Sequence, residues 1–108
     1  MTKIQQYRQD LKELSAKVKD LVAEKKFKSV NHALMTKFYK TAGNTEFKTL
    51  DGWNRDGYQV KKGSKPYVLW GKPEDMQGEG GAYTYFPLLF IFSNRQVIKQ
   101  ERRQQYAY

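Results

Sequence analysis

Apolar residues recur every three or four positions over the first 26 residues of the chain. At this spacing they share one side of a helix. The positions are Ile4, Tyr7, Leu11, Leu14, Val18 and Leu21. The pattern predicts a long amphipathic helix over residues 3 to 26. The same alternation of three and four is the repeat of a coiled-coil seam. Two interpretations follow: the seam packs within the chain, on a sheet or on the next helix, or it docks a second copy or a partner helix.

A second helix is predicted to begin after Ser29, whose hydroxyl suits an N-cap, and to run to about Thr41 before Gly43. Its apolar face comprises Val30, Leu34 and Phe38, and its polar side carries Lys37 and Lys40. Asn31 and His32 lie in the first turn, where backbone N–H groups can bind an anion. Of these two residues, we favour Asn31 as a ligand contact.

A third, short helix is predicted from its two ends. Thr49 is a suitable N-cap, and Gly57 ends the helix after Asp56. Trp53 lies within it. Trp53 has two interpretations: it anchors the core of a small domain, because tryptophan buries so much surface, or it stacks on a base.

Two strands, Tyr58–Val60 and Pro66–Lys72, are predicted to pair as a hairpin around the turn Lys61–Lys65. Gly63 supplies the permissive backbone that the turn needs. Alternate side chains of the second strand face opposite sides, with Tyr67, Leu69 and Gly71 on one side and Val68 and Trp70 on the other. One set is therefore expected in the core and the other against a ligand.

The stretch from Glu74 to Ala82 is polar and rich in glycine, which predicts a flexible hairpin loop. Its acids are Glu74, Asp75 and Glu79, so we expect it to lie away from a phosphate backbone or to gate access to it. The strand Tyr83–Phe92 follows. Pro87 within it predicts an edge position or a bulge, and the unbroken apolar run Leu88–Phe92 predicts core.

Together these elements predict an α+β fold: two N-terminal helices and a short third helix packed on a small, mostly antiparallel sheet. A chain of 108 residues has room for one modest core. Residues 1–26 would form the first helix, residues 27–97 the rest of the core, and residues 98–108 a basic tail that includes Arg102 and Arg103.

Charge narrows the choice of ligand. The chain has 20 Lys and Arg against 11 Asp and Glu, a net charge of +9, and 15% of its residues are aromatic. A positive surface that also offers flat rings suits single-stranded nucleic acid. Cysteine is absent, which excludes disulfides and thiolate metal sites. No apolar run is long enough to span a bilayer, so we expect a cytoplasmic protein outside the membrane.

Two kinds of side chain are expected to contact DNA, cations on phosphates and rings on bases. The cations are Lys37, Lys61, Lys62, Lys65, Lys72 and Arg95, and the rings are Tyr58, Tyr67, Trp70 and Trp53. Asn31 and Gln59 complete the set as polar contacts. No metal or other cofactor is expected.

Three segments carry a family resemblance. They are Ser29-Val30-Asn31-His32-Ala33-Leu34, the turn Gln59-Val60-Lys61-Lys62-Gly63-Ser64-Lys65, and Phe92-Ser93-Asn94-Arg95-Gln96. From about Phe27 to Val97 the chain resembles the N-terminal single-stranded-DNA-binding domain of the ArdC-type antirestriction proteins of mobile elements and phages. In that family the turn usually has the sequence Lys-Gly-Glu-Lys-Gly, whereas Ser64 replaces the acid here and Pro66 the second glycine.

The resemblance implies binding of single-stranded DNA in a phage or mobile-element context, and protection of that DNA from host nucleases. Larger members of the family continue into a metallopeptidase-like domain with a His-Glu-x-x-His helix. No such motif is present here, so no activity of that domain is expected.

Other functions remain open. One histidine and no cysteine do not supply a nucleophile with its base, and a metal nuclease would depend on Glu74, Asp75 and Glu79, so we predict a binding protein and not an enzyme. RNA or double-stranded DNA would satisfy the same phosphate contacts. A protein-interaction module built on the N-terminal heptads is a second class. Attachment of the basic helices to an anionic membrane surface is a third.

Overall fold

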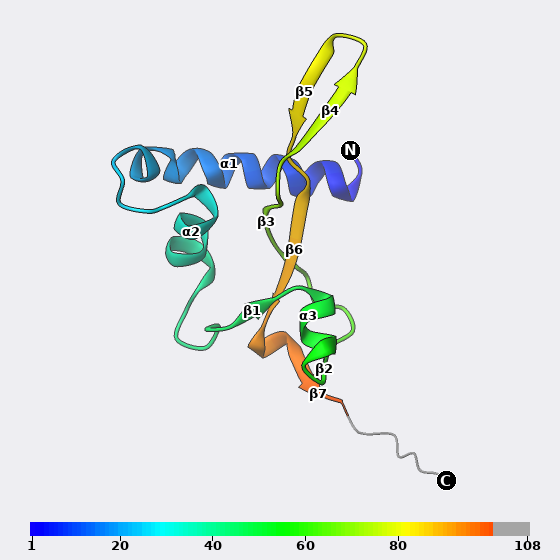
Figure 1. Cartoon of the computed structure of the whole chain (residues 1–108). Helices are drawn as coiled ribbons and strands as arrows, with labels where there is room; N and C mark the ends of the chain where they lie inside the picture. Colours follow the sequence, from blue (N-terminus) through cyan, green and yellow to red (C-terminus); the bar gives the residue numbers. More distant parts are fainter. Residues whose placement is uncertain (101–108) are drawn as a thin grey trace.

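The structure is a computed structural model that describes residues 1–100, so most of the predicted basic tail, with Arg102 and Arg103, lies outside the described residues. Its elements, in order, are α1 (Lys3–Ala23), α2 (Val30–Leu34), the π-helical turn η1 (Met35–Tyr39), β1 (Phe47–Lys48), α3 (Leu50–Arg55), β2 (Tyr58–Val60), β3 (Tyr67–Trp70), β4 (Glu74–Gly78), β5 (Gly81–Tyr85), β6 (Leu88–Ser93), the 3₁₀ turn η2 (Asn94–Gln96) and β7 (Val97–Lys99). The predicted α+β class is confirmed. Figure 1 shows α1 lying across the upper half of the β3–β6 sheet, with β4–β5 projecting above it and β2–β7 at the opposite end.

The first helix forms as its hydrophobic periodicity predicts. A capping box closes its start: the Thr2 hydroxyl accepts from the Gln5 backbone N–H at 3.1 Å, and the Gln5 side chain accepts from the Thr2 N–H at 2.7 Å. Leu11 and Val18, two turns apart, are fully buried. The helix ends earlier than predicted because Lys25 takes a left-handed conformation with φ of 64°.

The apolar seam of α1 packs within the chain. Leu11 and Val18 belong to a single core cluster with Leu34 of α2 and with Val68 of β3. Of the two interpretations of the heptad pattern, intramolecular packing is therefore confirmed, and these seam positions do not face a second copy. Among the described residues, no helix has the length and apolarity needed to cross a membrane.

The second helix begins as predicted but changes its winding. Ser29 caps it, accepting from the His32 N–H at 3.1 Å. After Leu34 the chain widens into the π-turn η1, in which hydrogen bonds span five residues instead of four. The residue that follows Leu34 on the buried side is therefore Tyr39, which is 9% exposed, and not Phe38, which is 41% exposed. The prediction that Phe38 packs inward is wrong for this reason.

The strands pair differently from the predicted hairpin. β3 pairs with β6, with Tyr67 opposite Ile91 and Trp70 opposite Leu88, and β2 pairs with β7. The predicted pairing of Tyr58–Val60 with Pro66–Lys72 is therefore wrong. β3 carries two adjacent buried residues and gains more apolar contact from β6, the longest strand, than a short polar β2 would supply. The prediction that β3 has one buried face and one face against a ligand is also wrong, since the adjacent residues Val68 and Leu69 are both buried.

The turn Lys61–Lys65 itself forms. Gly63 adopts the predicted left-handed conformation, with φ of 85°, and the Ser64 N–H donates to the Lys61 carbonyl at 3.1 Å. The turn is fastened to η2 and not to a partner strand: the Lys61 N–H donates to the Gln96 carbonyl at 2.8 Å, and the Gln96 side chain donates to the Lys65 carbonyl at 2.7 Å.

The glycine-rich stretch is structured. β4 and β5 form an antiparallel ribbon, with Met76 opposite Tyr83, where the sequence had predicted a flexible loop. The predicted strand Tyr83–Phe92 is divided at Pro87, which cannot donate to a ladder. The prediction of an edge position is wrong, because β6, which begins directly after Pro87, is the central strand of the order β1-β6-β3. Within β6, Ile91 is buried, and Leu88, Leu89 and Phe90 pack on the core while half-exposed.

Candidate nucleic-acid interface

The predicted contacts divide into two groups at the two ends of β3. Four residues, from Tyr67 to Trp70, form β3, and a strand rises about 3.3 Å per residue, so these two rings start roughly 10 Å apart along it. The group at the Tyr67 end of β3 comprises Tyr58, Gln59, Lys61, Lys62, Lys65, Tyr67 and Arg95. The group at the Trp70 end comprises Asn31, Trp70 and Lys72. Lys37 is exposed on η1.

Trp53 is a core residue. It is 2% exposed, and its indole N–H donates to the Phe92 carbonyl at 2.8 Å, which ties α3 to β6. The prediction that Trp53 stacks on a base is therefore wrong, and the alternative interpretation as a core anchor is confirmed. Tyr58 packs its ring edge-on against Trp53, with centroids 5.4 Å apart, and is half-buried.

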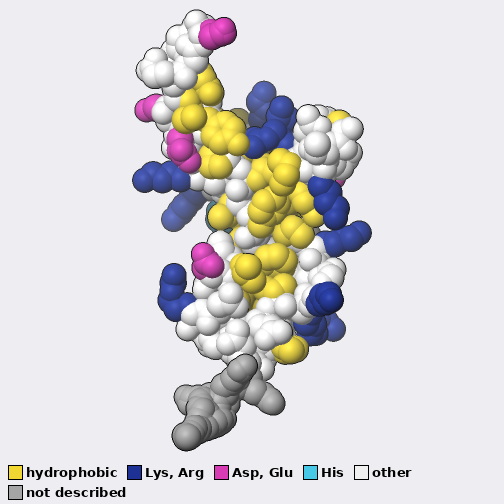
Figure 2. Space-filling model, turned by 90° about the vertical axis from the view of Figure 1, so that its right-hand side faces the viewer, with side chains coloured by type: hydrophobic (Ala, Val, Ile, Leu, Met, Phe, Trp, Pro, Cys, Tyr) yellow, Lys and Arg dark blue, Asp and Glu magenta, His cyan; other side chains and the backbone are white. Residues whose placement is uncertain are grey.

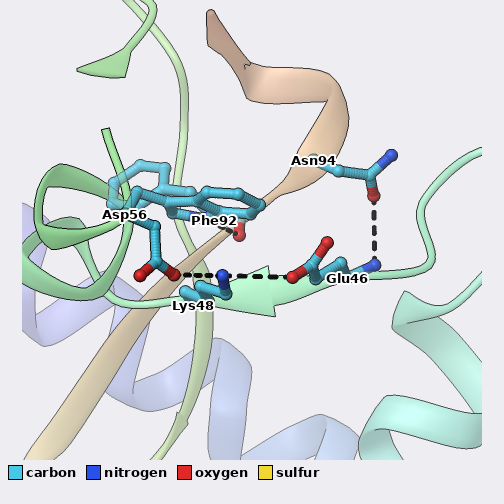
Figure 3. Close-up of polar contacts among 6 residues, drawn as sticks. Glu46, Lys48, Asp56, Phe92 and Asn94 are labelled. Carbon is cyan, nitrogen blue, oxygen red and sulfur yellow. Dashed lines mark hydrogen bonds and ion pairs between the residues drawn. The ribbon is translucent and has the colours of Figure 1, made fainter. Parts of the chain in front are cut away.

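A small charged cluster covers Trp53. Figure 3 shows the Lys48 ammonium between the carboxylates of Asp56 and Glu46; its nitrogen lies 3.1 Å from Glu46 and also bonds Asp56. The same nitrogen lies 4.7 Å from the centre of the Trp53 ring. The hydrogen bond to Asp56, and then the one to Glu46, raise the pKa of Lys48 above its ordinary value of 10.5. This cation is committed to neighbours in the fold, so it is not a candidate phosphate contact.

Tyr67 is also largely engaged by the protein. Its ring packs edge-on against Tyr39 at 5.2 Å and against Phe47 at 5.1 Å. Because two of its neighbours are aromatic and it is only partly exposed, Tyr67 offers a base little of its face.

Asn31 acts on Trp70 and not outward. Its side-chain amide donates to the Trp70 carbonyl at 2.8 Å and accepts from the Trp70 N–H at 2.9 Å. These backbone groups point away from β6, at the free edge of β3, where an unpaired strand edge would otherwise remain. Asn31 therefore replaces a strand partner and positions Trp70, and its role as a direct ligand contact stays a prediction.

Trp70 is fixed by three further contacts. Its indole N–H donates to the Ser15 hydroxyl of α1 at 2.9 Å, and Phe86 packs edge-on with ring centroids 6.3 Å apart. The Arg8 guanidinium lies 5.9 Å from the ring centre. A ring held in this way by its backbone and its edge keeps a defined orientation, which lowers the entropy lost when a ligand packs on it.

A groove of about 450 Å³ opens beside this ring. Its walls are largely apolar and are formed by Ser29, Val30, Asn31, Trp70, Gly71 and Phe86. Exposed lysines adjoin it in the chain on both sides, since Lys28 precedes Ser29 and Lys72 follows Gly71. A concave apolar slot whose lining residues have lysines as neighbours in the chain has the form expected of a site for a flat ring that carries phosphate.

Arg8 links the groove to the projecting hairpin. It donates to the Phe86 carbonyl at 2.9 Å and to the Tyr85 hydroxyl at 3.1 Å. The guanidinium carbon of Arg8 also lies 5.4 Å from the centre of the Tyr85 ring. Sequence analysis singled out neither Arg8 nor Phe86 as a site residue. No local signal pairs residues 78 positions apart.

Exposed apolar side chains also occur away from the α2 side of the molecule. Figure 2, which shows the face on the right-hand side of Figure 1, has a band of hydrophobic side chains that runs down from the projecting hairpin over the body, with lysines and arginines on both flanks. Phe86 is 46% exposed, a large value for a phenylalanine beside a core strand. Exposed apolar patches with a polar rim are typical of interaction sites.

The turn at the other end of β3 is a separate cationic surface. Lys61, Lys62 and Lys65 are all exposed, and the Lys61 ammonium donates to the Arg95 carbonyl at 3.1 Å. Arg95 is exposed and lies in the 3₁₀ turn η2, two residues after the end of β6 at Ser93. These residues retain the predicted placement on one surface, but without a free ring between them.

Acidic groups do not assemble into a metal centre in residues 1–100, where no three His, Cys, Asp or Glu side chains come together. Glu74, Asp75 and Glu79, the acids on which a nuclease would depend, belong to the exposed hairpin. No protein family, curated protein or solved structure matches this chain.

Proposed function

We propose that this protein binds single-stranded DNA with little sequence preference and that the groove beside Trp70 receives a base. The observation that supports this most directly is a partly buried indole ring, held by Asn31 and Ser15, which borders an apolar slot next to Phe86. Every base has a flat face, so stacking on such a ring does not select a sequence. Stacking on Trp70 needs a base whose face is free, so a groove of about 450 Å³ beside this ring favours an unpaired strand.

Phosphate contacts come from two surfaces in this proposal. Lys28 and Lys72 adjoin the groove, and Lys61, Lys62 and Lys65 form the turn at the other end of β3. A strand that follows β3 would meet both. The proposed role in protecting the DNA of a phage or mobile element from host nucleases rests on the resemblance to ArdC-type proteins alone.

The test is a titration of fluorescently labelled single-stranded DNA, duplex DNA and RNA of matched length, at low and moderate salt. Phe86→Ala removes an exposed wall of the groove, and we expect affinity for single strands to fall roughly 5- to 150-fold, as for loss of one stacking partner of about 1 to 3 kcal/mol. The double variant Lys28→Ala/Lys72→Ala should reduce the slope of log affinity against log salt by about 1.4, or about 0.7 per phosphate contact.

A control is available on α1, where Lys3 and Lys17 are also exposed and lie on another side of the helix than Ser15, which contacts Trp70. Lys3→Ala/Lys17→Ala removes the same charge and should change the slope much less. Lys61→Ala/Lys62→Ala tests the turn separately. If duplex and single strands bind alike and the control lowers affinity as much as the groove variants, binding is a general effect of the +9 charge and the proposal fails. Tighter binding of RNA would change the ligand and keep the site.

A further inference from the structure

The projecting hairpin is an element with two unlike faces. Residues directly opposite each other in an antiparallel pair share a face, so Met76 and Tyr83 lie together, and Tyr85 lies two residues along from Tyr83 on that same face. Thr84 and Asp75, which also oppose each other, lie on the reverse. Glu74 opposes Tyr85 and so lies on the face of Tyr83 as well. One face therefore carries two aromatic rings and a methionine, with one acid at its base, and the other face is polar.

The aromatic face is exposed. Tyr83 is 50% exposed, Tyr85 40% and Met76 38%, and every residue of both strands is exposed. Figure 1 shows the ribbon standing clear of the body. A two-stranded ribbon without a packing surface is marginally stable in water. A second molecule that packs against the aromatic face of β4–β5 would therefore stabilise this ribbon.

The charge of the hairpin excludes nucleic acid as the best partner. Residues 74–85 contain three acids and no lysine or arginine, although the whole chain is at +9. An acidic ribbon repels phosphate. Its complement is a basic surface, and the chain has one at the base of the ribbon, where Met1, Gln5, Arg8, Gln9 and Lys12 line a shallow groove of about 370 Å³ on α1.

The two surfaces are adjacent, because Arg8 of the basic groove contacts Tyr85 of the ribbon. When two complementary patches lie side by side on one chain, a two-fold axis between them places each patch on its opposite in a second copy. An unrelated partner would cover one of the two patches only. In a dimer of this chain, each acidic hairpin meets the basic groove of the other copy.

We propose that this chain forms a two-fold homodimer in which each β4–β5 hairpin packs its aromatic face against the second copy and places its acidic tip on the start of the partner's α1. Tyr83 and Met76 form the apolar part of this contact. Glu79 at the tip pairs with the basic groove around Lys12. The contact differs from the coiled-coil dimer that the heptads of α1 permit, since Leu11 and Val18 are buried within the chain.

The experiment is sedimentation velocity of nucleic-acid-free protein at near-physiological salt, where the Debye length of about 8 Å screens repulsion between the two whole molecules. The protein is measured from about 1 to about 100 µM, a range that brackets weak and moderate dimers. We expect a monomer–dimer equilibrium. Tyr83→Ser should raise the dimer dissociation constant at least about tenfold, as for loss of an aromatic anchor. Thr84→Ser, on the opposite face of the ribbon, is the matched control and should leave it unchanged.

Charge exchange tests which surfaces meet. Glu79→Lys and Lys12→Glu should each weaken the dimer, whereas a mixture of the two variants and the double variant Glu79→Lys/Lys12→Glu should restore it. The proposal is overturned if the wild-type protein stays monomeric over the range, if Tyr83→Ser and Thr84→Ser dimerise alike, or if the exchanged charges do not restore association. Circular dichroism of each variant verifies that the fold is kept. None of these outcomes depends on DNA binding at the groove.

Discussion

The bond between Asn31 and the edge of β3 makes a sharp prediction for Asn31→Ala. The substitution removes two hydrogen bonds, one to the Trp70 carbonyl and one from the Trp70 N–H. Each is worth about 1 kcal/mol net, so about 2 kcal/mol of unfolding free energy should be lost. We add no further penalty for the stranded backbone groups, because the adjoining groove is open and water can reach them.

A loss of this size is large for a small domain, whose whole stability is on the order of 5 to 15 kcal/mol. It should lower the melting temperature by roughly 8 to 15 °C. Urea unfolding followed by tryptophan fluorescence and by circular dichroism measures it. Thr36→Ala is the control, because Thr36 lies in the π-turn η1 that continues the same helix and is exposed.

DNA binding distinguishes positioning from direct contact. If Asn31 acts by orienting Trp70, Asn31→Ala should weaken single-strand binding because the ring loses its fixed position. The free energy of unfolding should fall in the same variant. A variant as stable as the wild type with its affinity abolished would refute this reasoning and would assign Asn31 to the ligand, as the sequence first suggested.

Two further predictions concern the core. Trp53→Ala should cost about 3 to 5 kcal/mol of stability in urea unfolding, because it empties a buried site and strands the Phe92 carbonyl; an unchanged midpoint with lost DNA binding would restore the stacking role. Tyr39→Phe removes the hydroxyl that donates to the Val68 carbonyl, and it should lower the unfolding free energy by about 1 to 2 kcal/mol at neutral pH. Burial raises the pKa of Tyr39 above 10.0, so stability linked to it is full below that value and is lost as pH rises through the raised pKa of the folded state. Urea midpoints at about pH 8 and about pH 11 should therefore differ less in the phenylalanine variant than in the wild type, and an equal alkaline loss would contradict this linkage.

Elements whose causes are local could be predicted from the sequence. The first helix follows from its hydrophobic period, and the N-caps Ser29 and Thr49 accept from N–H groups three residues ahead, as expected. Gly63 takes the left-handed turn conformation because it has no side chain to clash with the backbone. These interactions span a few residues, and any fold that includes the segment retains them.

Features that depend on a choice between distant partners could not be predicted. β2 and β3 each have a strand pattern, but burial of Val68 and Leu69 selects β6 as the partner of β3. The π-turn exchanges Phe38 for Tyr39 on the buried side, and its wider winding has no clear signal in the residue pattern.

The candidate site shows the same division. Composition and charge indicated a basic, ring-bearing surface, because a partner senses the summed charge and the exposed rings wherever the chain places them. Only the tertiary structure decided which rings are presented. Trp53 and Trp70 were both predicted to stack on bases, yet the first is enclosed between α3 and β6 and the second borders a groove. Contacts across 39 residues to Asn31, across 55 to Ser15, and between Arg8 and the hairpin determine this, and such contacts arise only when the whole chain has folded.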